Sequence, residues 1–407
     1  MKFKDQKGIA LMLALGTVMV LTTLAIEFAY NSHVSYSMAL NERDRLRAYY
    51  LARSALQLAK LEMGMEKEIR GKFASQLQQA GVPSQPICQQ FPFSTAILRG
   101  LVATEEGGPA LPGRPGEGEG QEKKEPEKTP EEEKKGEVDL SFLREEQAKD
   151  FLDFEGDFSV HCEAEESKLN LNFFRTAGSD PYEEQKQTLE TLFLEKRFEP
   201  VFEKKREQIK KVVQNIADWV DRNDRINEAP GIEGGYEDSL YVGSEYTYKV
   251  KNGKMASLAE LLLVSGVGDD LFNLAGPSLT VYGGNKINIC IADDAIIKAV
   301  VLKYVNSQQG VAPIRPDDEE ALAKVLDAIH QSCLLTQEPN AIAGAINKAL
   351  GITTAGSSPI QSLFTTETRF YSFDLTGQSG DIELKVRVVL DAKGNSNEWK
   401  MLYYRVQ

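Results

Sequence analysis

The densest group of oxygen-bearing side chains lies between positions 218 and 238. It reads Asp218-Trp-Val-Asp221-Arg-Asn223-Asp224, then Glu228, then Glu233-Gly-Gly-Tyr-Glu237-Asp238. Hard cations such as Ca²⁺ take about six to eight oxygen ligands and accept irregular loops. Turn residues that would let the loop wrap around an ion are Pro230, Gly231, Gly234 and Gly235. The stretch therefore has the composition of a divalent-cation site.

Two interpretations of this acidic stretch stay open on the residues alone. It is not an EF-hand, because Arg225 and Ile226 stand where that loop needs a ligand and a glycine. It is either an irregular cation site or an acidic surface loop that caps its neighbours. Asp218 precedes Trp219 on an expected helix, where it would orient a ligand rather than bind the ion.

Other residue types that do chemistry are present without the spacing that chemistry requires. The three histidines form no HExxH motif, and the sequence has no GxSxG elbow and no phosphate-binding glycine loop. His161, beside an expected strand, is interpreted as structural. The sequence therefore predicts a protein that is not an enzyme and has no small-molecule substrate.

The four cysteines are Cys88, Cys162, Cys290 and Cys333, and no two of them form a CxxC pair. A zinc or redox motif is therefore not indicated. In an oxidising compartment one or two disulfides can form among three full connectivities. Four buried free thiols are the alternative, and the spacing alone does not decide between them.

The charge balance argues against a nucleic-acid partner. The 407 residues carry a formal net charge of −14, which would repel phosphates. The stretch from Leu261 to Ala275 is similar to a helix-hairpin-helix, whose glycine turn offers backbone amides to a phosphate. Asp269 and Asp270 follow that turn here and would repel the phosphate. Packing of a helix pair is the interpretation that we prefer.

The first sixty residues are expected to form one long helix to which the rest of the chain is attached. Residues 9–26 contain no charge, which is about the length that crosses a bilayer as a helix. Lys2, Lys4 and Lys7 precede them, which predicts a cytoplasmic N-terminus and an exported body. The helical rhythm then continues beyond the apolar segment to Gly64. A cleaved signal peptide, with a site near 23–25, and a plain signal anchor are the alternatives.

The N-terminal leader resembles a known type of processing signal. A short basic segment ending in Lys7-Gly8, followed at once by an apolar helix, resembles the class III signal of type IV pilins and type II secretion pseudopilins. The resemblance implies cleavage by a prepilin peptidase between Gly8 and Ile9, with the helix kept as the core of a filament. Most members carry Glu at the fifth position after the cut, and this chain has Leu13. Leucine there is typical of the K-type minor pseudopilin, for which no subunit lies above.

Further segments extend the resemblance to the K-type minor pseudopilin family (general secretion pathway protein K) over nearly the whole chain. They are Arg43–Ser54, Glu165–Asn172, Asp218–Asp221, Ser257–Gly266 and Lys286–Ile289. The resemblance implies a protein of the bacterial inner membrane with a periplasmic body. It also implies a tip complex with minor pseudopilins of the I and J types, and the H type as a further candidate, that starts and caps the pseudopilus for export of folded proteins. Prepilin peptidase and inner-membrane lipid are the other implied partners.

Calcium enters through the same resemblance, because the family binds Ca²⁺ in its globular part. On that basis the expected ligands are Asp221, Asp224, Glu233 and Asp238. Two other functions stay open on the sequence: a tip minor pilin of a type IV pilus, and a membrane-anchored periplasmic calcium-dependent hydrolase.

The predicted fold class is α+β, with a long N-terminal transmembrane and amphipathic helix packed on a pilin-like antiparallel sheet and a large inserted α-helical domain. Strands are expected at 157–160 and 168–172 as two arms of a hairpin, and at 368–375, 382–390 and 398–406 as a meander. The expected parts are a leader at 1–8, the long helix at 9–64, a helix and loop continuation at 65–102, a disordered Glu/Lys/Pro/Gly-rich insertion at 103–138, the first part of the pilin-like domain at 139–180, the inserted α-domain at 181–282, and helices with the C-terminal meander at 283–407.

Overall fold

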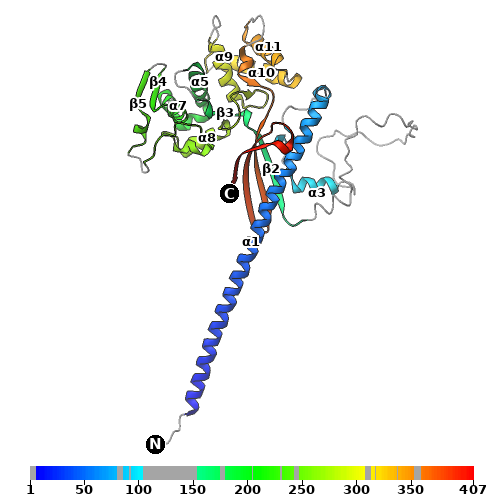
Figure 1. The fold of residues 1–407 in the computed structure, drawn as a ribbon, viewed down its shortest axis with the longest axis vertical. Coiled ribbons are helices and arrows are strands. Elements are labelled where there is room, and N and C mark those ends of the chain that lie inside the picture. The colour runs from blue at the N-terminus through cyan, green and yellow to red at the C-terminus, as the bar shows by residue number, and fades with distance from the viewer. Residues whose placement is uncertain are drawn as a thin grey trace, which may run out of the picture.

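The structure is a computed structural model of the chain, in which a long helical rod carries a sheet and a separate helical domain (Figure 1). It describes residues 6–79, 86–90, 93–103, 154–174, 179–203, 205–229, 232–242, 247–307, 313–316, 318–336, 338–352 and 359–407. The predicted insertion at 103–138 lies, from residue 104 onward, outside the described residues, as do residues 1–5 of the predicted leader.

The rod is α1 (Gln6–Gln79), and its first half is apolar and exposed. By length and composition it is the one helix in the described part of the chain that is able to cross a membrane, over Gly8–Phe73. The helix continues beyond Gly64 to Gln79, into the stretch expected as a helix and loop continuation, with non-helical angles only at Phe73. One glycine costs a helix only about 1 kcal/mol. Packing of the neighbouring residue Met63 into the core offsets that cost.

The sheet has five antiparallel strands in the order β1-β2-β9-β10-β11. These strands are β1 (Phe93–Ser94), β2 (Asp157–Ala164), β9 (Phe370–Ser379), β10 (Ile382–Asp391) and β11 (Lys400–Val406). Alternate residues of β10, among them Leu384, Val386 and Val388, are buried against α1, as their period of two predicts. The predicted C-terminal meander is confirmed, except that its first strand continues beyond residue 375 to Ser379 and the turn falls at Gly380.

The rod meets the sheet through a row of small residues. Ala48, Ala52, Ala55 and Ala59 recur at helical spacing and are completely buried in this contact. Two short helices, α2 (Ile87–Gln90) and α3 (Thr95–Ala103), flank β1 and β2. A disulfide joins Cys88 of α2 to Cys162 of β2.

The inserted domain has its own hydrophobic core, which extends from Leu169 to Phe364. Its helices are α5 (Asp180–Phe193), α6 (Glu199–Phe202), α7 (Arg206–Val220), α8 (Asp269–Ala275), α9 (Asp294–Ser307), α10 (Glu319–Leu335) and α11 (Pro339–Leu350). The predicted boundary at 282 is therefore wrong. Helices α9, α10 and α11 pack into the inserted domain rather than completing the pilin-like domain, and a disulfide joins Cys290 to Cys333 of α10.

The predicted hairpin between 157 and 172 is also wrong. After β2 a 3₁₀ turn leads to β3 (Leu169–Asn170), which pairs in parallel with β6 (Leu279–Thr280) of the inserted domain. The other short pairs are antiparallel β4 (Arg225–Ala229) with β5 (Ile232–Tyr236), and parallel β7 (Ile287–Asn288) with β8 (Phe364–Thr365). Polar side chains hold residues 169–172 against the inserted domain. The side-chain amides of Asn170 and Asn172 donate to carbonyl oxygens of residues 255 and 281–284.

Candidate metal centre and assembly helix

Three carboxylates from separate parts of the sequence meet beneath the β4–β5 hairpin. Asp218 lies in the last turn of α7, Asp221 follows the helix as its C-cap, and Glu237 begins the 3₁₀ turn after β5. One oxygen of each lies within 4.8 Å of the others. All three side chains are buried, with Glu237 only 1% exposed. The spacing of three residues between Asp218 and Asp221 places both at one helix end.

Amide and hydroxyl groups satisfy part of this cluster. Gln214 Nε2 donates to Asp218 Oδ1 at 2.7 Å, and Asn227 Nδ2 donates to Asp221 Oδ2 at 3.0 Å. The Tyr182 hydroxyl lies 3.3 Å from Asp221 Oδ2 and 3.4 Å from Asp218 Oδ1. These contacts orient two of the three carboxylates.

The remaining oxygens have no donor among the described residues. They are Asp218 Oδ2 and both oxygens of Glu237. A buried carboxylate without a hydrogen bond or a counter-charge is strongly destabilising, so such groups in folded proteins are normally paired or bound to a metal. A cation bound among the three carboxylates would supply the partner that these oxygens lack.

Electrostatics in the cluster support the same interpretation. Burial, together with the negative charges of Asp218 and Asp221, raises the pKa of Glu237 to about 9. Burial and the neighbouring Asp218 raise the pKa of Asp221 to about 7, and burial also raises the pKa of Asp218. Lys186, which donates to Gln214 Oε1 at 2.6 Å, lowers the pKa of both aspartates but does not cancel these shifts. A divalent cation among these oxygens would keep all three ionised.

The donor set also restricts which metal fits. The three carboxylates and the neighbouring Tyr182 hydroxyl offer only oxygen, and Asn227 faces them with its amide nitrogen as a hydrogen-bond donor. Hard cations such as Ca²⁺ and Mg²⁺ prefer that set, whereas zinc prefers histidine and cysteine. The residues present therefore fit a hard divalent cation.

Of the predicted ligands whose side chains the structure describes, one lies in the cluster and two do not. Asp221 is in the cluster. Asp224 points to solvent beside Arg225, and only its backbone oxygen approaches the site, by accepting from the Glu237 amide at 3.2 Å. Asp238 Oδ1 instead accepts from the Val250 amide at 3.0 Å.

The fourth predicted ligand, Glu233, lies in β5, and its side chain is outside what the structure describes. Sequence reasoning missed Glu237 as a ligand and gave Asp218 only an orienting role. The signal that could have found Asp218 is its spacing from Asp221. Glu237 joins the pair only because the β4–β5 hairpin folds back onto α7, and no local pattern predicts that.

The predicted processing site lies at the beginning of α1. Gly8 and Ile9 are both helical and exposed, and a side chain added at Gly8 would meet nothing within 4 Å. Leu13 is 65% exposed on the same apolar segment. The segment continues as one helix into the body, so whatever holds the apolar half also fixes the position of the sheet (Figure 1).

A long apolar helix that is continuous with a domain of antiparallel sheet defines a pilin-like subunit. Residues 167–284, which include the first half of the inserted domain, match the family described as type II secretion system (T2SS), protein K. The predicted resemblance to the K-type minor pseudopilin is confirmed by this match. This match over residues 167–284, together with the one N-terminal apolar helix of the described residues, fits an anchor in the inner membrane.

The chain can also be compared with curated proteins and with solved structures. Among curated proteins, none matches the chain. Among solved structures, one similar chain comes from the crystal structure of the GspK-GspI-GspJ complex of the enterotoxigenic Escherichia coli type 2 secretion system. That chain is 15% identical, and the alignment covers 62% of this chain and 80% of that one with a TM-score of 0.42.

Proposed function

We propose that this protein forms the tip of a type II secretion pseudopilus and acts as a structural component rather than as an enzyme. The observation that carries the proposal is the position of the inserted domain. It lies beside the sheet, at the end of α1 opposite the apolar segment (Figure 1). Subunits that pack against the apolar half of α1 would therefore lie below this bulk, and the inserted domain would obstruct a subunit above it.

Processing and partner choice follow from α1. Prepilin peptidase would cut between Gly8 and Ile9 and leave the apolar helix to pack with neighbouring helices. Small residues at Ala10, Ala14 and Gly16 permit a close approach of such helices. Leu13 needs no charged partner from a subunit above, whereas a carboxylate at this depth in the membrane would need one. Minor pseudopilins of the I and J types, which accompany the K type in the solved complex, are the proposed neighbours.

Calcium is the proposed cofactor, held by Asp218, Asp221 and Glu237. The ion would join the C-terminal end of α7 to the turn after β5, and so fix the β4–β5 hairpin on the inserted domain. Its role is structural, because no nucleophile and base converge on the three carboxylates among the described residues. The body of the protein would then face the periplasm, where Ca²⁺ is available and disulfides such as Cys290–Cys333 persist.

The experiment that tests the tip role is co-purification from membranes. The full chain is expressed with I-type and J-type minor pseudopilins, extracted in detergent and analysed by native mass spectrometry. A tip subunit should give a complex with one copy of this chain. A Gly8→Val variant should resist cleavage and accumulate outside the complex, and the added side chain meets nothing in the fold. Complexes with several copies of this chain, or none with the other subunits, would contradict the proposal.

A further inference from the structure

Strand β11 forms one open edge of the five-stranded sheet. It pairs with β10 on one side, and within the described residues no strand pairs with its other side. Six of its seven residues are exposed and the seventh is partly buried. A long, apolar and unpaired edge is a template for another strand, so proteins normally cover or shorten it. The opposite edge of the sheet, β1, has only two residues.

The register shows which backbone groups of β11 remain available. Lys385 and Gln407 exchange two backbone hydrogen bonds, at 2.8 and 3.2 Å. In an antiparallel pair such residues alternate with residues whose amides point away from the partner strand. The amides and carbonyls of Tyr404 and Val406, opposite Val388 and Val386, therefore face the open edge.

The two faces of β11 have different chemistry. On the α1 side lie Tyr404, whose hydroxyl is 3.2 Å from that of Tyr49 in α1, and Val406. These two side chains are 40% and 42% exposed. On the other side lies Tyr403, whose ring centroid is 6.0 Å from that of Tyr282 in the inserted domain, together with Arg405. One face is therefore apolar and the other carries positive charge.

The edge strand is positively charged, whereas the chain as a whole is negatively charged. Residues 400–407 contain Lys400 and Arg405 and no acidic residue, whereas the whole chain has a net charge of −14. Arg405 lies directly opposite Arg387 of β10, and like charges in such a pair are unfavourable. Arg387 has one ion-pair contact, to Asp374 at 3.8 Å, and Arg405 makes no hydrogen bond or ion pair with any residue that the structure describes.

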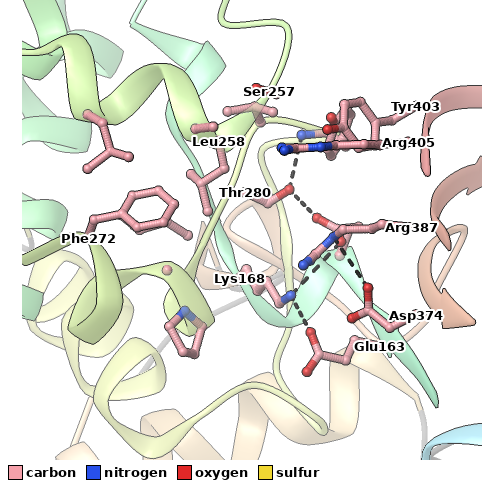
Figure 2. A pocket seen from close by; sticks show the side chains of 18 of the residues that line it. Glu163, Lys168, Ser257, Leu258, Phe272, Thr280, Asp374, Arg387, Tyr403 and Arg405 are labelled. Atoms are coloured by element: carbon pink, nitrogen blue, oxygen red, sulfur yellow. Dashed lines mark hydrogen bonds and ion pairs between the residues drawn. The ribbon is translucent and has the colours of Figure 1, made fainter. Parts of the chain in front are cut away.

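A groove of about 580 Å³ runs beside this charged face (Figure 2). Tyr403, Arg405 and Arg387 form one wall, and Leu258 and Phe272 of the inserted domain lie across from them (Figure 2). Deeper in the groove the carboxylates are already engaged: Glu165 accepts from the Thr280 hydroxyl, and Glu163 binds Lys168. Arg405 thus remains for an incoming group, beside Arg387, whose own contact with Asp374 is 3.8 Å long.

We propose that β11 is the docking edge for an extended strand from a neighbouring subunit of the pseudopilus tip. The strand would bond to the amides and carbonyls of Tyr404 and Val406. It would place apolar side chains beside these residues and carboxylates beside Arg405 and Arg387. This inference rests on the proposed function, because that function supplies the neighbours. A second copy of this chain is disfavoured as the occupant, since it would bring the same cations to the edge.

The test uses the full chain with the I-type and J-type subunits in detergent. Val406→Pro removes an outward amide that β10 does not use, so the sheet itself is preserved, whereas Val406→Ala keeps the amide. Proline should weaken binding about fivefold relative to alanine, the effect of one lost hydrogen bond. Arg405→Glu should weaken it further, whereas Lys324→Glu, the same charge change on α10, should leave it unchanged.

Hydrogen exchange of residues 400–407 provides a readout that is independent of any substitution. The amides of Tyr404 and Val406 should exchange quickly in the chain alone and slowly in the complex, whereas that of Gln407 is already bonded to β10. Equal binding by Val406→Pro and Val406→Ala, or edge amides that stay fast in the complex or are slow in the chain alone, would overturn the strand inference and leave the tip role intact. Loss of all association by the unaltered chain would overturn both.

Discussion

Gly377 of β9 lies against the backbone of Ala48 in α1 so closely that no side chain fits between them. A Cβ at position 377 would stand 1.9 Å from the Ala48 carbonyl oxygen and 2.9 Å from the Ala52 amide nitrogen. The rod and the sheet are thus held at a distance that only a glycine and a row of alanines permit. Because the same rod continues into the apolar segment, this contact transmits the position of that segment to the body.

The first prediction concerns this contact. Gly377→Ala should lower the free energy of unfolding by about 1–3 kcal/mol, because the backbone of α1 has to move away from the new methyl group. Urea denaturation in detergent measures it. The control is Gly344→Ala inside α11, where an added Cβ meets nothing within 4 Å. That change should stabilise the chain by about 0.5–1 kcal/mol. Equal effects of the two substitutions would show that the close approach is not needed.

The second prediction concerns the metal centre. Ca²⁺ at about 100 times its Kd should stabilise the chain by roughly 2.7 kcal/mol, seen as a higher Tm. Glu237→Gln should abolish this response. In a chelator at neutral pH it should be at least as stable as the unaltered chain, because the amide is neutral without the proton that Glu237, with its pKa raised to about 9, has to bind on folding.

The matched control for that experiment is Asp224→Asn. The Asp224 side chain is 71% exposed and outside the cluster, so the variant should keep the full response to Ca²⁺. Loss of the response in Asp224→Asn together with its survival in Glu237→Gln would reverse the assignment of the ligands.

The third prediction concerns pH. Glu166, 7% exposed, accepts from the amides of Arg369 and Phe370 at 3.0 and 3.1 Å, and burial raises its pKa from 4.5 to about 7. The folded state therefore binds the proton more tightly than the unfolded state does. Stability from this group is complete below pH 4.5 and is lost as pH rises through 7. When the pH is raised from 5 to 8, the unaltered chain should therefore lose about 2 kcal/mol more of its free energy of unfolding than the Glu166→Gln variant does. Parallel pH profiles of the two proteins would contradict this assignment.

The fourth prediction concerns the disulfides. Cys290 and Cys333 are 43 residues apart, so their bond reduces the conformational entropy of the unfolded inserted domain. Replacing both with serine should lower the free energy of unfolding by about 2–4 kcal/mol. Tryptophan fluorescence separates the domains, because Trp219 lies in the inserted domain and Trp399 beside the sheet. The Trp219 transition should shift more than that of Trp399, and an unchanged Trp219 transition would argue against the bond.

Much of the fold follows from local patterns in the sequence. The period-two alternation in β10 predicts one buried face, and the recurrence of Ile209, Val213 and Ile216 predicts α7. The leader and apolar segment predict the exposed half of α1. These patterns depend only on near neighbours in the chain, which is why sequence reasoning finds them.

The errors in the prediction depend on contacts between distant residues. The hairpin expected after β2 does not form, because Leu169 pairs with Leu279 instead. The boundary at 282 fails because α9 buries residues such as Val301 in the inserted domain. Glu237 enters the metal centre only through the fold of the β4–β5 hairpin. In each case the deciding partner is remote in sequence, and a single sequence shows no sign of it.

N-terminal sequencing of the chain purified from membranes of secreting cells tests the central claim most directly. A pseudopilin that is processed and kept in the membrane should begin Ile9-Ala10-Leu11 and retain the whole apolar helix. A chain that begins after Ala25, or that still begins at Met1 in cells with active prepilin peptidase, would contradict the assignment of α1 as the helix that assembles the pseudopilus.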